Sequence, residues 1–154
     1  MNTIATLLSP ERILVRCDAT IKKRVFELAA QLFAEQGMDT AAIFDALFAR
    51  EKLGSTGLGQ GIAIPHGRMD GLDHALGAFI RLEQAIDFDA PDGRPVNQLF
   101  VLLVPTDANQ QHLQLLAELA QRFSNADFRA RLDAADTPQA IADLFAAAAP
   151  ATTA

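Results

Sequence analysis

The sequence predicts one α/β domain in which a mixed or largely parallel sheet lies between two layers of helices. Three observations carry this prediction. The chain has 154 residues, half of them hydrophobic and 21% charged, which suits a single globular domain. Helical and strand patterns alternate along it. Residues 99–104 form a continuous apolar run, typical of a strand that is covered on both faces.

Two helices are expected in the first third of the chain. The first has Thr20 as its N-cap and ends near Gly37. The second begins at residues 39–40 and must end by Gly54, where the sequence becomes rich in glycine. Arg50 therefore lies in the last turn of the second helix.

Strands and further helices follow. Strands are expected at residues 62–64, 75–82 and 99–104, with a loop or hairpin at 85–95. The helical pattern resumes after residue 105, with Asn109 as the candidate cap, and shorter helices are expected at 127–132 and 137–148. We place the domain at residues 1–150 and expect residues 151–154 to form a frayed tail.

Composition excludes several classes of function. The net charge of -6 and the pI of about 4.9 argue against nucleic acid as a partner. No apolar run approaches the roughly 20 residues that span a membrane, so no membrane insertion is expected. A single cysteine, Cys17, and the lack of a signal peptide point to the cytoplasm, with Cys17 as a buried small hydrophobe.

The most unusual segment is GSTGLGQGIAIPHG, residues 54–67. A phosphate-binding P-loop would need Lys and Ser/Thr where Gln60 and Gly61 stand, and a dinucleotide fingerprint would need glycine at Ile62 or Ile64. The three histidines lack the spacing of metal ligands, and His74 fits a solvated turn. We therefore expect neither a metal site nor a nucleotide cofactor bound through either motif.

His66 is the candidate nucleophile of this segment. It follows Pro65 and precedes Gly67, a context that fixes the backbone and leaves the ring accessible. A neutral imidazole has a lone pair that can attack phosphorus, and glycine-rich turns can direct backbone N–H groups at anionic oxygens. This one segment thus combines a candidate nucleophile with a loop of the kind that can bind an anion.

Arg50 and His112 are the candidate assistants of His66. Arg50 could offer a forked cationic donor, and His112 could hydrogen-bond the phosphoryl group or the His66 ring. His66 and His112 each follow a predicted strand, so both could meet at one sheet edge. A purely structural interpretation is equally open at this point. In it, Arg50 is a cation that stabilises a helix C-terminus, and His112 is a core histidine with its hydrogen bonds satisfied.

The run REKLGSTGLGQGIAIPHGR, residues 50–68, resembles the active-site signature of the fructose/mannitol-type IIA components of the bacterial phosphotransferase system. Within this family, the sequence resembles the nitrogen-regulatory IIA proteins. The resemblance continues through QLFVLLVP at 98–105 and HLQLLAELAQRF at 112–123. It covers nearly the whole chain and implies an α/β sandwich with a mixed sheet of about five strands.

The resemblance also implies a set of roles. His66 accepts a phosphoryl group on Nε2 from a small HPr-like phosphocarrier, through a phosphohistidine intermediate. Arg50 and His112 assist it. Mannitol-type relatives have an acid where Gln60 stands, so a carboxylate role at that position is not carried over. The loop that shapes the phosphate cradle consists of Ser55, Thr56, Gly57, Gly59 and Gly61.

Three functions remain open. The leading interpretation is a regulatory protein that binds target proteins according to its phosphorylation state, because no IIB, IIC or HPr-like segment is recognised in the sequence. The alternative is a sugar-uptake IIA component that passes the phosphoryl group to a separate IIB domain. The third is an interaction module without transfer. A weak homodimer is a further option for a partner.

Overall fold

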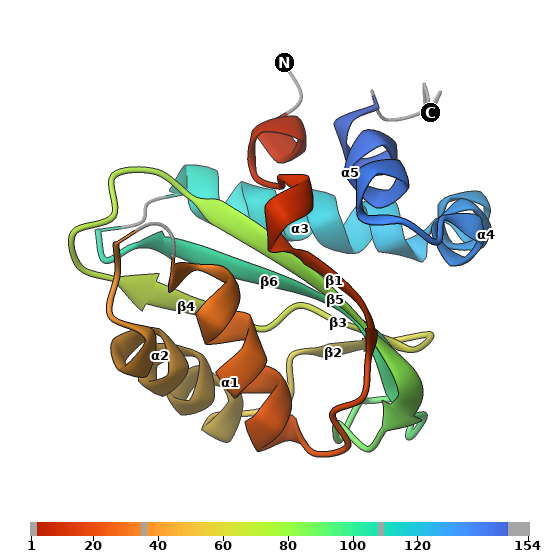
Figure 1. Ribbon diagram of the computed structural model, residues 1–154, viewed down its shortest axis with the longest axis horizontal. Coiled ribbons are helices and arrows are strands. Elements are labelled where there is room, and N and C mark those ends of the chain that lie inside the picture. The colour runs from red at the N-terminus through yellow and green to blue at the C-terminus, as the bar shows by residue number, and fades with distance from the viewer. Residues whose placement is uncertain (1–2, 35–36, 108–109, 148–154) are drawn as a thin grey trace.

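A mixed six-stranded sheet forms the centre of the computed structural model (Figure 1). The structure describes residues 3–34, 37–107 and 110–147, with side chains except at 3, 5 and 110–112. The strands along the main path of the sheet are β1 (Ile13–Cys17), β5 (Leu76–Ile86), β6 (Val96–Pro105), β3 (Ile62–Ala63) and β2 (Gly57–Gly59). A sixth strand, β4 (His66–Met69), also pairs with β6.

Strands β3 and β4 occupy one position in the sheet. Ile62 pairs with Gln98 and His66 with Leu102, which is the same parallel register against β6. Between the two strands the ladder continues through the N–H of Leu102, which donates to the carbonyl of Pro65 at 2.9 Å. The six strands therefore fill five positions, in agreement with the sheet of about five strands that the family resemblance implies. The predicted strand 62–64 is shorter than expected, and His66 begins a strand of its own.

Helices cover both faces of the sheet (Figure 1). Helices α1 (Lys22–Leu32) and α2 (Thr40–Lys52) lie on one face. The other face carries α3 (Gln110–Ser124), α4 (Ala126–Ala134), α5 (Pro138–Ala146) and the 3₁₀ turns η1 (Thr3–Thr6) and η2 (Pro10–Arg12). This arrangement confirms the predicted α/β sandwich.

The continuous apolar run of β6 is explained by two separate cores. Within residues 99–104, the odd-numbered residues, such as Val101, pack in the core beneath α1 and α2, and the even-numbered residues, such as Phe100, pack beneath α3, α4 and α5. Both residues are fully buried. Successive side chains of a strand point to opposite faces of the sheet. A strand that is covered on both faces therefore has apolar residues at successive positions, rather than apolar and polar residues in alternation.

The helix starts follow the sequence with one correction. Asp39 caps α2 by accepting from the N–H of Ala41 at 3.1 Å. The predicted cap at Thr20 is wrong. The extended backbone of Ile21 makes that residue the N-cap, and α1 begins at Lys22 without a side-chain cap. The predicted cap Asn109 and the tail 151–154 lie outside the described residues.

Candidate active site

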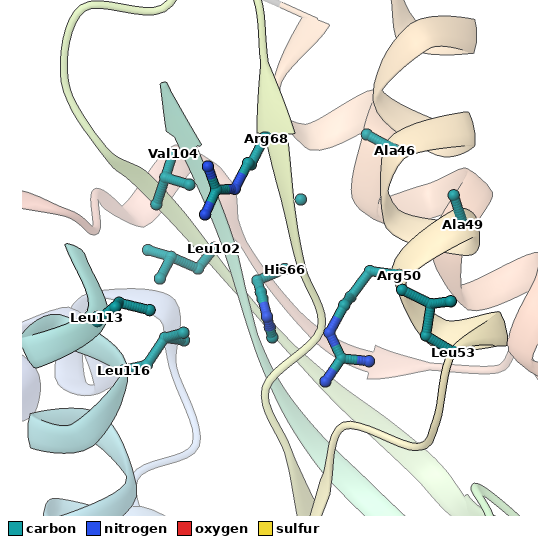
Figure 2. A pocket seen from close by; sticks show the side chains of 11 residues that line it. Ala46, Ala49, Arg50, Leu53, His66, Arg68, Leu102, Val104, Leu113 and Leu116 are labelled. Atoms are coloured by element: carbon teal, nitrogen blue, oxygen red, sulfur yellow. The ribbon is translucent and has the colours of Figure 1, made fainter. Parts of the chain in front are cut away.

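A pocket of about 360 Å³ lies at the edge of the sheet, between α2 and α3 (Figure 2). His66 and Arg68 of β4 line it together with Leu102 of β6 and Arg50 of α2. The other lining residues are Ala46, Ala49, Leu53, Gly67, Val104, Leu113 and Leu116. The pocket is thus an apolar hollow that contains one imidazole and two guanidinium groups.

The His66 ring is held by its own backbone. Nδ1 lies 3.0 Å from the carbonyl oxygen of Ile64. A carbonyl oxygen can only accept, so in the neutral ring Nδ1 carries the proton and Nε2 keeps its lone pair. The ring is half-buried in the pocket (Figure 2). The nitrogen available for reaction is therefore Nε2.

The surroundings of His66 favour its neutral form. Burial is the largest cause that lowers the pKa of His66 below 6.5, its ordinary value. The positive charges of Arg50 and Arg68 lower this pKa further, whereas the hydrogen bond to Ile64 and the charge of Glu51 raise it. The net shift is downward. At neutral pH the nucleophilic form of the ring is thus dominant.

Arg50 reaches the pocket from the last turn of α2, as predicted. Its Nη1 donates to the carbonyl of Gly54 at 2.8 Å, which ties the guanidinium to the end of its own helix. Figure 2 shows this guanidinium beside His66. The structure thus brings the two predicted residues Arg50 and His66 together in one pocket.

Gly67 allows α2 to approach β4. A Cβ at this position would lie 3.1 Å from the Cβ of Ala46 and 3.2 Å from its carbonyl carbon. Both distances are shorter than ordinary van der Waals contacts between carbon atoms. The small residue therefore sets the separation of α2 from β4, and with it the position of Arg50 relative to His66.

Glu51 is a site residue that the sequence analysis did not identify. Its side chain is only 4% exposed, and its Oε2 accepts from Nζ of Lys22 at 2.8 Å. Its Oε1 accepts from Oγ1 of Thr56 at 2.6 Å, and both oxygens lie 3.3 Å from the N–H of Thr56. This buried carboxylate joins α1, α2 and the loop that follows Arg50. A lysine 29 positions away gives no local signal in the sequence.

The predicted cradle residues do not line the pocket. Oγ of Ser55 donates to the carbonyl of Phe88 at 2.6 Å and accepts from the N–H of Gly57 at 3.0 Å. Thr56 is bound to Glu51. Gly59 and Gly61 have positive φ angles of 90° and 80° and flank the tight turn between β2 and β3. The loop is anchored in the fold, and its cradle role stays a prediction.

Gln60 lies in the same turn, with a φ of 59°. Its N–H donates to Oδ2 of Asp92 at 2.9 Å, which fixes the turn to the segment between β5 and β6. It is not among the residues that line the pocket around His66. The structure therefore assigns Gln60 a place in the hairpin.

His112 lies in the first turn of α3, but its side chain is outside the described part of the structure. Leu113 and Leu116 of the same helix line the pocket. The structure thus places α3 beside the pocket of His66, and the predicted meeting of His66 with His112 stays a prediction. The role of His112 stays a prediction.

Among the described residues, no three His, Cys, Asp or Glu side chains are grouped so that they could hold a metal ion. His74 is exposed and hydrogen-bonds Asp73, away from the pocket, as expected for a solvated turn residue. The helices within the described ranges are too short or too polar to cross a membrane.

Comparisons with known proteins agree with this fold. Residues 6–148 match the family model described as "Phosphoenolpyruvate-dependent sugar phosphotransferase system, EIIA 2". A nitrogen regulatory protein of Pseudomonas aeruginosa is 47% identical over 143 residues, covering 92% of this chain and 93% of that protein. A fructose-specific EIIA component of Haloferax volcanii is 35% identical over 148 residues, covering 95% of this chain and 96% of that protein.

A solved structure is also similar. The crystal structure of the nitrogen regulatory protein IIA-Ntr from Neisseria meningitidis matches with a TM-score of 0.87 and 45% identity, covering 92% of this chain and 98% of that one. The chain therefore belongs to the EIIA type 2 family of the phosphoenolpyruvate-dependent sugar phosphotransferase system. Within this family it is similar to the nitrogen regulatory IIA-Ntr proteins, which confirms the resemblance found in the sequence.

Proposed function

We propose that this chain accepts a phosphoryl group from an HPr-like histidine phosphocarrier on Nε2 of His66, and that its phosphorylation state controls its binding to regulatory target proteins. The observation that carries the proposal is the geometry of His66. Its Nδ1 is engaged by Ile64, so that Nε2 is the nitrogen left to react within a pocket that contains two cations.

The transfer is a direct displacement at phosphorus. The Nε2 lone pair of His66 attacks the phosphorus of the donor phosphohistidine, the N–P bond of the donor breaks, and that electron pair returns to the donor imidazole. The charge in transit spreads over the phosphoryl oxygens, so positioned cations stabilise it. Arg50 supplies such a cation. His112 assists the transfer, and Ser55, Thr56, Gly57, Gly59 and Gly61 shape the loop beside it, as the family motif implies.

Phosphorylation of His66 changes the charge of this surface. A phosphoryl group adds between one and two negative charges at neutral pH, by analogy with other phosphorylated side chains. The unmodified pocket presents the two guanidinium groups of Arg50 and Arg68. Adding the anion reduces or cancels their charge, so a partner whose charge matches one state will bind the other state less well. This supports a role as a switch that binds targets.

A sugar-uptake role is the second candidate. The family description names a sugar phosphotransferase system, and the Haloferax volcanii relative is named a fructose-specific EIIA component. In that role the phosphoryl group on His66 would pass to a cysteine or histidine of a separate IIB domain. An interaction module in which His66 transfers nothing is the third candidate.

Intact-protein mass analysis after mixing with a phosphorylated HPr-like carrier tests these functions. We expect wild type to gain one phosphoryl group, His66→Ala to gain none, and Arg50→Ala to gain it more slowly. A fructose-type IIB domain is then added to the phosphorylated protein. Retention of the group supports the regulatory role, and rapid loss to the IIB domain supports sugar uptake. Absence of phosphorylation in wild type would leave the interaction module.

A further inference from the structure

Arg68 is a second arginine of the pocket, and the proposed function gives it no role in the transfer step. It lies two residues after His66 on β4, so both side chains leave the strand on the same face. Their register partners on β6, Leu102 and Val104, line the same pocket. The topology of the strand therefore places a guanidinium beside the reactive imidazole.

A single hydrogen bond tethers this guanidinium. Nη1 of Arg68 donates to the carbonyl of Thr106 at 3.1 Å. Thr106 is itself fixed to β4, since its N–H donates to the carbonyl of Met69 at 3.2 Å and its Oγ1 to Oδ1 of Asp70 at 2.6 Å. The anchor of Arg68 is thus held at two further points.

Arg50 is tethered in the same manner from α2, by one hydrogen bond to the carbonyl of Gly54. Figure 2 shows the Arg50 and Arg68 guanidinium groups on opposite sides of His66. Within the described residues neither is paired with a carboxylate. A guanidinium has five N–H donors, so each keeps donors for a ligand.

Two cations without carboxylate partners, on either side of a nucleophile in an apolar pocket, form an anion site. We propose that Arg68 binds the oxygens of the phosphoryl group that is transferred to Nε2 of His66, from the side opposite Arg50. The proposal rests on the proposed function for the identity of the group that enters the pocket. It makes Arg68 a phosphoryl-binding residue in addition to Arg50.

The test separates phosphoryl binding from docking of the carrier. Phosphoramidate is a small donor without a protein surface. Nε2 of His66 attacks its phosphorus, the P–N bond breaks, and the nitrogen leaves as ammonia. Phosphorylation is followed by intact mass with phosphoramidate and, in parallel, with the HPr-like carrier. The variants are Arg68→Ala, Arg68→Lys and the control Arg131→Ala, which removes an exposed arginine of α4 that does not line the pocket.

We expect Arg68→Ala to slow phosphorylation by both donors to a similar extent, about tenfold, as for the loss of one charge-assisted hydrogen bond. Arg68→Lys should lose less, and Arg131→Ala should match wild type. Thermal unfolding of each variant checks that the fold is intact.

Two results would overturn the proposal. Wild-type rates for Arg68→Ala with both donors would show that Arg68 does not contact the phosphoryl group. Slowing with the carrier alone would make Arg68 a docking residue. If wild type reacts with phosphoramidate but not with the carrier, the proposed donor is wrong, and the phosphoramidate rates still decide the role of Arg68. If neither donor modifies His66, both proposals are wrong.

Discussion

The imidazole of His66 is tied to the carbonyl of Ile64, two residues earlier, by a hydrogen bond of 3.0 Å from Nδ1. The bond spans Pro65, whose ring fixes its own φ and thereby restricts the path between the two groups. It sets both the orientation of the ring and the position of its proton. The reactivity of the site thus depends on a local backbone contact within the motif I-P-H.

The first prediction concerns the pH dependence of transfer. The pKa of His66 lies below 6.5 because burial disfavours the charged ring. The rate of phosphorylation by phosphoramidate should therefore fall as the pH is lowered, after correction for titration of the donor, with a midpoint below pH 6.5. A midpoint at or above pH 6.5 would show that the pKa of the ring is not lowered.

The second prediction concerns Glu51. Glu51→Gln keeps the shape of the side chain but removes the charge that pairs with Lys22. It also replaces one of the two acceptor oxygens, which face Lys22 and Thr56, by an NH2 donor. Because the carboxylate is buried, the free energy of unfolding in denaturant should fall by about 1–3 kcal/mol. Phosphorylation should slow as well, because the loop after Arg50 loses its anchor.

Asp127→Asn is the matched control for Glu51→Gln. It removes an exposed carboxylate that pairs with Arg131 on α4, and the free energy of unfolding should change by less than about 1 kcal/mol. Equal effects of the two substitutions would contradict the anchoring role of Glu51.

The third prediction concerns Gly67. Gly67→Val places side-chain carbons where the backbone of Ala46 already lies, so α2 must move away from β4. We expect a loss of about 1–3 kcal/mol in the free energy of unfolding. Phosphorylation of the folded protein should also slow, because Arg50 moves with α2. A variant that is destabilised but transfers at the wild-type rate would show that this helix spacing does not position Arg50.

The fourth prediction concerns docking. Leu53 and Leu113 line the pocket and are 85% and 60% exposed. Exposed apolar side chains beside a reactive group suit contact with a protein donor. Leu53→Ser and Leu113→Ser should weaken binding of the carrier, which is measured as a higher KM for the carrier. The rate of phosphorylation by phosphoramidate should stay unchanged.

Ile21→Ser serves as the control for these two substitutions, since Ile21 is 59% exposed at the start of α1 and does not line the pocket. It should leave the KM for the carrier unchanged. If it raises that KM as much as Leu53→Ser does, the leucines beside the pocket are not specific docking residues.

The features that could be predicted from the sequence are those with local patterns. The apolar run of β6 and the helical spacing of α2 predicted the sheet and the helix that carry the site. The motif around His66 was visible because its glycines and Pro65 are contiguous. Arg50 could be placed at a helix end because Gly54 follows it closely.

The features that were missed depend on distant or subtle contacts. Glu51 meets Lys22 across 29 positions, so no spacing in the sequence reports the pair. The strand β4 was not predicted because Pro65 stands just before it and Gly67 lies within it, and both residue types are unfavourable in a strand pattern. Because that strand was not predicted, it could not be foreseen that the side chains of Arg68 and His66 point to the same face of the sheet. Thr20 was misplaced as a cap because an apolar residue, Ile21, takes that position without a side-chain bond.

The most direct test of the central claim is nuclear magnetic resonance of the phosphorylated protein, with ¹⁵N-labelled histidine, after reaction with the HPr-like carrier. The account predicts a single phosphohistidine at residue 66, with phosphorus coupled to Nε2 and a proton retained on Nδ1. Phosphorus on Nδ1 of His66, or on another histidine, would contradict it.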